Sequence, residues 1–133
     1  MGAVAVDKDG RVAAATSTGG LVNCLPGRIG DSCLIGAGCY AKNSTCAVSG
    51  TGDGEFLIGG AIANSISNAM DFAGMKVQEA CDFIINVKNG ESKGDIGVIA
   101  VDALGNIGIT FNSKRMHRAW LSPGQALKVK IYR

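Results

Sequence analysis

The chain has little of the side chains that common binding functions require. Its 133 residues include one histidine, two tyrosines, one tryptophan and four phenylalanines, and its 13 lysines and arginines are scattered along the sequence. Without clustered positive charge or aromatic rings for base stacking, the composition argues against nucleic-acid binding. No run approaches the roughly 18 apolar residues of a membrane-spanning helix. We therefore expect neither nucleic acid nor a membrane as a partner.

Metal ligands and paired cysteines are also scarce. His117 stands beside Arg118 and Trp120 without any ligand spacing, and no nucleophile motif lies near it. Five cysteines form an odd set without a Cys-x-x-Cys pair, which indicates reduced thiols. Met1 leads directly into a strand-like pattern, so we expect no secretion signal. The sequence predicts a cytoplasmic protein without a metal or an organic cofactor.

Glycine, by contrast, is abundant, at 20 positions, in a chain that is 47% hydrophobic and 18% charged. This composition supports a hydrophobic core, and the length favours a single domain over residues 1–133. So many glycines predict tight turns and close approaches between the backbone and its neighbours.

Two similar hairpins frame the sequence. The first covers residues 2–7 and 12–17 around an Asp-Gly turn, and the second covers residues 95–102 and 106–112. The tetrapeptide Ile-Ala-Val-Asp in the second hairpin repeats Val-Ala-Val-Asp in the first. Nearly every position is apolar, which is typical of strands covered on both faces.

Two amphipathic helices are expected between the hairpins. One covers residues 54–72, with isoleucine or methionine at every fourth position and Gly74 placed to end it. The other covers residues 76–87. Further strands are expected at residues 45–50 and 127–132.

These elements predict an α+β fold in which one largely antiparallel sheet carries a helical pair on one face. A single helical layer leaves the second face of the sheet uncovered, although its strands are apolar on both sides. We therefore expect a partner chain or a second copy to bury roughly 2,000 Å² or more at that face.

Arg28 and Asp31 are candidate binding residues in a loop built with Pro26, Gly27 and Gly30. An arginine can bind a carboxylate through two hydrogen bonds, and an aspartate can bind an ammonium group. Together they suit a small zwitterion. The alternative is an internal salt bridge between them, which the local sequence by itself favours.

The glycine-rich segment from Thr51 to Gly54 precedes the first expected helix. Its free N–H groups could stabilise an oxyanion near the helix N-terminus. The alternative is an ordinary helix start capped by Thr51 or Asp53. The hydroxyls of residues 16–18 are equally ambiguous, because β-branched hydroxyl residues are common in strands.

Taken together, these segments resemble the β subunit of plant-type L-asparaginase/isoaspartyl aminopeptidase, an N-terminal-nucleophile hydrolase. The likeness covers nearly the whole chain, and the blocks Thr-Ser-Thr-Gly-Gly (residues 16–20) and Gly-Arg-Ile-Gly-Asp-Ser (residues 27–32) are close to diagnostic. The resemblance implies half of an αββα sandwich and hydrolysis of the side-chain amide of L-asparagine or an isoaspartyl peptide. It also implies an α subunit from the same precursor, in an (αβ)2 assembly or a homo-oligomer.

The resemblance further implies roles for six residues, and it favours a split pair of charges over a salt bridge within the loop. Three would belong to the catalytic machinery and three to substrate binding. Thr18 matches a hydrogen-bond partner of the nucleophile, Thr51 and Gly52 an oxyanion hole, Arg28 the ligand of the substrate α-carboxylate, Asp31 the ligand of its α-amino group, and Gly54 a backbone contact to that amine.

The start of the chain departs from the family pattern. Family β chains begin Thr-Val-Gly-Ala-Val-Ala, and autoproteolysis exposes a threonine whose own α-amine, with a pKa of roughly 7.7–8.0, can accept its hydroxyl proton. Aligned on Gly2, Met1 takes the second position. We therefore expect the nucleophile to be missing and this chain alone to be inactive.

Two alternatives stay open. The chain could be a catalytically inactive relative that acts as an aspartate-binding or structural assembly protein. It could also be a glycosylasparaginase, which shares the Gly-Arg-x-Gly-Asp-Ser block. Gly19, Gly20 and the expected lack of a secretion signal argue against this second alternative.

Overall fold

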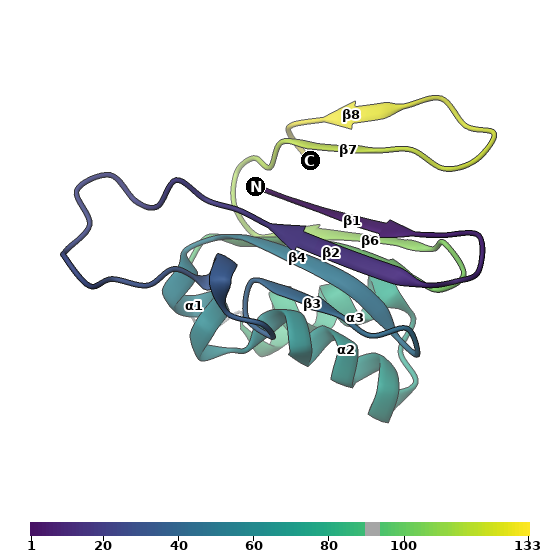
Figure 1. Ribbon diagram of the computed structural model, residues 1–133, viewed down its shortest axis with the longest axis horizontal. Helices are drawn as coiled ribbons and strands as arrows, with labels where there is room; N and C mark the ends of the chain where they lie inside the picture. Colours follow the sequence, from purple (N-terminus) through teal and green to yellow (C-terminus); the bar gives the residue numbers. More distant parts are fainter. Residues whose placement is uncertain (90–93) are drawn as a thin grey trace.

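The computed structural model describes residues 1–89 and 94–133 and shows an α+β fold (Figure 1). The strands form three antiparallel sheets, ordered β1-β2, β3-β4-β5-β6 and β7-β8. The strands are β1 (Gly2–Val6), β2 (Val12–Thr16), β3 (Cys39–Ala41), β4 (Cys46–Gly52), β5 (Ile96–Asp102), β6 (Ile107–Phe111), β7 (Arg118–Trp120) and β8 (Lys128–Lys130). The helices are the 3-10 helix η1 (Asp31–Cys33), α1 (Gly54–Gly59), α2 (Ile62–Ala73), α3 (Val77–Asp82) and the π-helix η2 (Phe83–Lys88).

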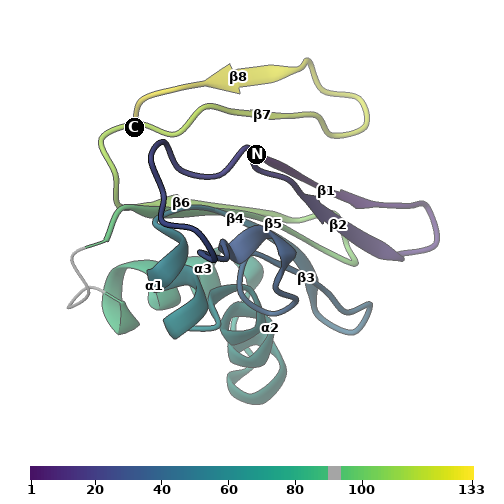
Figure 2. The same cartoon turned by 60° about the vertical axis from the view of Figure 1, so that its left-hand side comes forward.

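One face of the four-stranded sheet carries the hydrophobic core. The helices lie on one face of this sheet (Figure 2). Because side chains alternate along a strand, the even-numbered residues of β4 and β5 share one side, and the hydrophobic ones among them belong to the core cluster together with helical residues. Val48 and Val98 are fully buried there, against Ile62 and Ile66 of α2. The predicted helical layer on one face of an antiparallel sheet is confirmed.

The helix predicted over residues 54–72 is broken in two. Between α1 and α2 lie Gly60 and Ala61, and the backbone of Ala61 is left-handed, with φ 43°. The N–H of Ala63 donates to the carbonyl of Ala37 at 3.1 Å, so the start of α2 is attached to the loop before β3. This break depends on a tertiary contact, which apolar periodicity does not encode.

The other helical predictions agree with the structure. Gly74 ends α2 in the left-handed conformation, with φ 65°, and its N–H donates to the carbonyl of Met70 at 3.1 Å. Of the predicted residues 76–87, all but Lys76 are helical, as α3 followed directly by η2, and Lys76 is the N-cap of α3.

The strands do not form the single sheet that the sequence predicts. The β1–β2 hairpin is a separate sheet that lies on the other face of the central sheet from the helices (Figure 2). Gly2 lies so close to β4 that a side chain would collide with Ser49, and Thr16 Oγ1 lies 2.7 Å from Ser49 Oγ. The chain therefore covers part of its own second face, which the sequence did not predict, and burial of the remainder by a partner stays a prediction.

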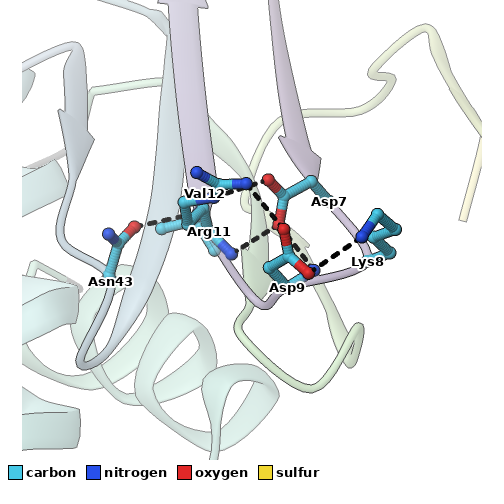
Figure 3. Close-up of polar contacts among 6 residues, drawn as sticks. All are labelled: Asp7, Lys8, Asp9, Arg11, Val12 and Asn43. Atoms are coloured by element: carbon cyan, nitrogen blue, oxygen red, sulfur yellow. Dashed lines mark hydrogen bonds and ion pairs between the residues drawn. The ribbon is translucent and has the colours of Figure 1, made fainter.

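The repeated Val-Ala-Val-Asp and Ile-Ala-Val-Asp motifs build the same turn twice. Asp7 Oδ1 accepts the N–H groups of Asp9 and Arg11, each at 2.9 Å, while Oδ2 accepts Nε of Arg11 at 2.8 Å (Figure 3). Asp102 Oδ1 likewise accepts the N–H groups of Leu104 and Asn106, each at 2.9 Å. In each turn, the glycine three residues after the aspartate takes a positive φ, 76° and 82°. An aspartate that ends a strand therefore fixes both hairpins.

Candidate functional site

The loop after β2 brings Arg28 to the first turn of α1. Its Nε donates to Glu55 Oε1 at 2.9 Å, and only 18% of its side chain is exposed, against 62% for Glu55. The hydrogen bond to Glu55 raises the pKa of Arg28 and lowers that of Glu55. In the part of the chain that the structure describes, Arg28 makes no ion pair with Asp31, so the salt bridge that the local sequence favours is not formed.

Asp31 is a buried carboxylate at the start of η1, with 8% of the residue exposed. Its Oδ2 atom is buried and lacks a hydrogen-bond partner among the described residues. Burial raises the pKa of Asp31, while its own backbone N–H, the N-terminal ammonium group and Arg28 act in the opposite direction. A buried oxygen without a donor can accept a hydrogen bond from a ligand.

Arg28 and Asp31 meet at Gly54. A Cβ atom at position 54 would lie 2.9 Å from Asp31 Oδ1 and 3.0 Å from Arg28 Nη2. A guanidinium nitrogen and a carboxylate oxygen therefore lie beside the same piece of backbone, with no room for a side chain between them. Sequence reasoning placed these three residues in one site, and the structure brings them together.

Thr51 and Gly52 end β4 just before this point. They pair with Gly97 and Ile96 of β5, and Gly52 has φ 121°, where a side chain would collide with the carbonyl of Asp95. Asp53 occupies the N-cap position of α1, but its side chain makes no cap hydrogen bond. Its Oδ2 instead accepts the N–H of Asp95 at 3.0 Å. Thus neither alternative cap predicted for this helix start is formed by a side chain.

Thr18 lies just beyond the end of β2 and is exposed. Its Oγ1 accepts the N–H of Gly20 at 3.0 Å. Met1 and Ser17 pair across the hairpin, since the N-terminal ammonium donates to the Ser17 carbonyl at 3.0 Å and the Ser17 N–H donates to the Met1 carbonyl at 2.8 Å. The start of β1 therefore lies next to Thr18, and its ammonium group is close enough to Asp31 to lower the pKa of that carboxyl.

Two residues of this site were missed by the sequence reasoning. Glu55 holds the Arg28 guanidinium, and Gly38 leaves the space that the Asp31 carboxylate fills, since a side chain there would collide with it. The Gly-Ala-Gly run at residues 36–38 was a signal for the close approach at Gly38. Glu55 gave a weaker signal, because acidic residues are common in the first turn of any helix.

The cysteines and His117, the other reactive side chains considered from the sequence, are not part of this site. All five cysteines are free, and burial raises the pKa of Cys46 to about 11 and that of Cys81 further, so both are held as thiols. His117 is exposed in the segment before β7. Within residues 1–89 and 94–133, no group of three or more His, Cys, Asp or Glu side chains could hold a metal ion. In the same ranges, no helix is long and apolar enough to cross a membrane.

The layers define the class of protein. Helices on one face of an antiparallel sheet, with a second sheet on its other face, form half of an αββα sandwich of the N-terminal-nucleophile hydrolase type. Residues 1–131 match the protein family described as asparaginase. The chain belongs to this family.

Named relatives agree with this assignment. The chain is 49% identical to an isoaspartyl peptidase of Escherichia coli K12 over 133 residues, which is 100% of the chain and 41% of that protein. It is 44% identical to a probable isoaspartyl peptidase/L-asparaginase 2 of Arabidopsis thaliana over 99% of the chain and 40% of that protein. It is also 41% identical to a plant-type L-asparaginase of Pyrobaculum calidifontis over 94% of the chain and 42% of that protein. The chain thus spans about two fifths of the length of these relatives.

Proposed function

We propose that the chain is the β portion of an asparaginase/isoaspartyl peptidase that hydrolyses the side-chain amide of L-asparagine or of isoaspartyl peptides. The observation that carries the proposal is the convergence of Arg28 and Asp31 on Gly54. A guanidinium and a carboxylate at one place match the α-carboxylate and the α-ammonium group of an aspartyl substrate. The names of the relatives support this substrate class.

In the proposed complex, Arg28 binds the substrate α-carboxylate through the guanidinium nitrogens that Glu55 does not occupy. Asp31 binds the α-ammonium group through its carboxylate, whose Oδ1 lies beside Gly54. The backbone of Gly54 contacts the same amine. Thr51 and Gly52, which closely precede Gly54, form the oxyanion hole for the substrate carbonyl.

The proposed nucleophile is a threonine that directly precedes Met1. The antiparallel pairing of Met1 with Ser17 supports this, because it sets the preceding position opposite Thr18, the proposed hydrogen-bond partner of the nucleophile. The threonine α-amine takes the hydroxyl proton, and Oγ attacks the amide carbon. Ammonia or an amino-peptide leaves, and water then hydrolyses the ester to release the aspartyl product. Autoproteolysis of a precursor exposes the amine.

The polypeptide of residues 1–133 is accordingly proposed to be inactive on its own, since the Met1 thioether cannot act as the nucleophile. Its proposed partner is an α portion of the same precursor, in an (αβ)2 assembly or a homo-oligomer in the cytoplasm. The length of the relatives supports this, because more than half of each relative lies outside the matched part.

The test is ammonia release from L-asparagine and aspartate release from an isoaspartyl dipeptide. Residues 1–133 alone should release neither. The same residues preceded by a free N-terminal threonine, and assembled with the unmatched portion of the E. coli relative, should hydrolyse both. Arg28→Ala should then abolish turnover, whereas Arg115→Ala, which removes an exposed positive charge elsewhere, should leave it unchanged. Release by residues 1–133 alone would contradict the proposed nucleophile.

A second candidate function is an aspartate-binding relative without catalysis, which the convergence of Arg28 and Asp31 on Gly54 also supports, because binding of the two charged groups requires no nucleophile. It predicts that the threonine-bearing assembly binds L-aspartate in an Arg28-dependent manner but releases no product. The hydrolysis assay and calorimetry on the same sample distinguish the two functions.

A further inference from the structure

Two hydroxyl groups meet under the start of β1, where the β1–β2 hairpin lies on the central sheet. Thr16 Oγ1 lies 2.7 Å from Ser49 Oγ, and it also donates to the carbonyl of Gly38 at 3.1 Å. Because the single hydroxyl proton of Thr16 goes to Gly38, Ser49 is the donor between the two hydroxyls. Ser49 is buried, with 3% of the residue exposed. A directed chain of hydrogen bonds therefore joins β2 to β4 at this point.

Gly2 lies directly against this pair and stands opposite Thr16 across the hairpin. The neighbouring pair, Met1 and Ser17, exchanges two hydrogen bonds. Gly2 and Thr16 are therefore a non-hydrogen-bonded pair, in which side chains approach most closely. A Cβ atom at position 2 would collide with the Ser49 oxygen and would lie 2.9 Å from Ser49 Cβ. The Ser49 hydroxyl thus fills the space of the missing side chain and sets how closely β1 approaches β4.

The hydroxyl pair lies one layer away from the proposed catalytic groups. Side chains of a strand repeat their direction every two residues, about 7 Å apart. Two residues after Ser49, β4 carries Thr51 of the proposed oxyanion hole. Thr18 follows Thr16 by two residues, and the proposed nucleophile precedes Gly2 by two. The start of β1, the end of β2 and helix α1, which follows β4, lie at the same end of the molecule (Figure 1). All three steps therefore lead toward the candidate site.

Gly38 connects the same hydroxyl pair to Asp31. The Gly38 carbonyl accepts the Thr16 hydroxyl and also the Gly50 N–H, the latter at 2.7 Å. A Cβ atom at position 38 would collide with Asp31 Oδ2, so the buried side of that carboxylate lies against Gly38. The pair under β1 is thus attached, through one glycine, to the residue that is proposed to bind the substrate amine.

We propose that Thr16 and Ser49 are positioning residues, whose paired hydroxyls fix the start of β1 on β4 and so hold the nucleophile in line with Thr18 and Thr51. Both act through Gly2 and not on the substrate. The inference rests on the proposed function, which supplies the nucleophile. Its expected consequence is kinetic. A misplaced nucleophile lowers kcat, whereas the groups that bind the charges of the substrate stay in place and preserve KM.

A second buried hydroxyl pair provides a matched control. Thr45 Oγ1, in the residue before β4, lies 2.6 Å from Ser67 Oγ of α2, and Ser67 is 1% exposed. Ser67→Ala and Ser49→Ala each remove one buried hydroxyl from a pair, so both should lower the midpoint of urea unfolding by similar amounts. Only Ser49→Ala removes a hydroxyl under the start of β1. Stability alone therefore does not separate the two variants, but the rate of hydrolysis should.

The kinetic test uses the assembly described above, the chain behind a free N-terminal threonine together with the unmatched portion of the E. coli relative. Ser49→Ala should lower kcat for L-asparagine by about tenfold or more and change KM by less than about twofold. Thr16→Val should also lower kcat, and Thr16→Ser, which keeps the hydroxyl, should restore most of it. Ser67→Ala should leave both constants unchanged. An unchanged kcat in Ser49→Ala, or equal losses in Ser49→Ala and Ser67→Ala, would overturn the proposal.

Amide exchange in the chain alone tests the positioning without substrate. The Ser17 N–H, which donates to the Met1 carbonyl, reports on the start of β1, and the Ala13 N–H, opposite Ala5, reports on the rest of the hairpin. Ser49→Ala should accelerate exchange at Ser17 by about tenfold or more and leave Ala13 unchanged. Equal Ser17 rates with and without the substitution would overturn the proposal. An accelerated Ser17 in an assembly that hydrolyses nothing would support the positioning and count against the proposed function.

Discussion

Arg28 forms an ion pair with Glu55, and this contact determines how the guanidinium group is oriented in the site. Glu55 bonds to Nε alone, so it orients the guanidinium plane while Nη2 stays beside Gly54. A fixed plane matters because a carboxylate binds arginine best through two parallel hydrogen bonds. Glu55 is therefore a positioning residue in the proposed site.

Glu55→Gln tests this role. The variant keeps a hydrogen-bond acceptor but loses the charge, so the guanidinium should be held less firmly and L-aspartate should bind about twofold to fivefold more weakly. The thermal unfolding midpoint should change little, because the substituted Glu55 side chain is exposed. Calorimetric titration measures the affinity, and Asp9→Asn serves as a control that removes a carboxylate from the β1–β2 turn. Equal affinities for Glu55→Gln and the unsubstituted chain would contradict the role.

Burial of Asp31 is unfavourable, because its Oδ2 has no hydrogen-bond donor among the residues that the structure describes. Its pKa is raised in the folded chain, chiefly by burial, so the folded state binds more protons than the unfolded state between the ordinary and the raised pKa. Stability from this group should therefore decrease as the pH rises through that window. Asp31→Asn should be as stable as the unsubstituted chain or melt about 2–4 °C higher at neutral pH.

Urea unfolding at a series of pH values checks this sign. The stability advantage of Asp31→Asn should disappear as the pH falls below the ordinary carboxyl pKa, and the variant should bind L-aspartate more weakly. A variant that is strongly less stable at neutral pH would show that the carboxylate serves the fold and not a ligand.

At the scale of elements, the two aspartate turns are the clearest link between sequence and fold. Asp102 is nine-tenths buried and accepts three hydrogen bonds, two from backbone N–H groups and one from Asn106 Nδ2 at 2.8 Å. Asp102→Ala should therefore lower the free energy of unfolding by about 1–3 kcal/mol. Asp102→Asn keeps an acceptor oxygen and should lose less. Urea denaturation gives both values, and an unchanged midpoint for Asp102→Ala would contradict the account of the turn.

The sequence predicted the elements better than their arrangement. Hairpins and helices followed from an Asp-Gly turn, a repeated strand motif and apolar periodicity, which are local properties. The break at Ala61 did not, because it depends on a contact with Ala37. The separate β1–β2 sheet was also missed, since apolar alternation shows that a strand is covered and does not show by what.

The same distinction applies to the candidate site. The spacing of Arg28 and Asp31 placed two charges in one loop, but it could not exclude a salt bridge between them. The structure separates the two groups because Glu55, 27 residues further on, takes the guanidinium. The spacing of residues within a motif does not predict a contact with a residue that is distant in the sequence.

At the scale of the whole molecule, one face of the central sheet is covered by helices and the other face is only partly covered. The helices and the central sheet enclose the core, whereas β1, β5, β6 and β7 line a groove on the other face. The candidate site lies where β1 starts.

The central claim is that Arg28 holds the α-carboxylate and Asp31 the α-ammonium group of one aspartyl ligand. Calorimetric titration with L-aspartate, β-alanine, which lacks the α-carboxylate, and succinate, which lacks the amine, tests it most directly. The unsubstituted chain should prefer L-aspartate to both. Arg28→Ala should lose only the preference over β-alanine, and Asp31→Asn only the preference over succinate. If both variants keep both preferences, the two residues do not bind the ligand and the assignment of the site is wrong.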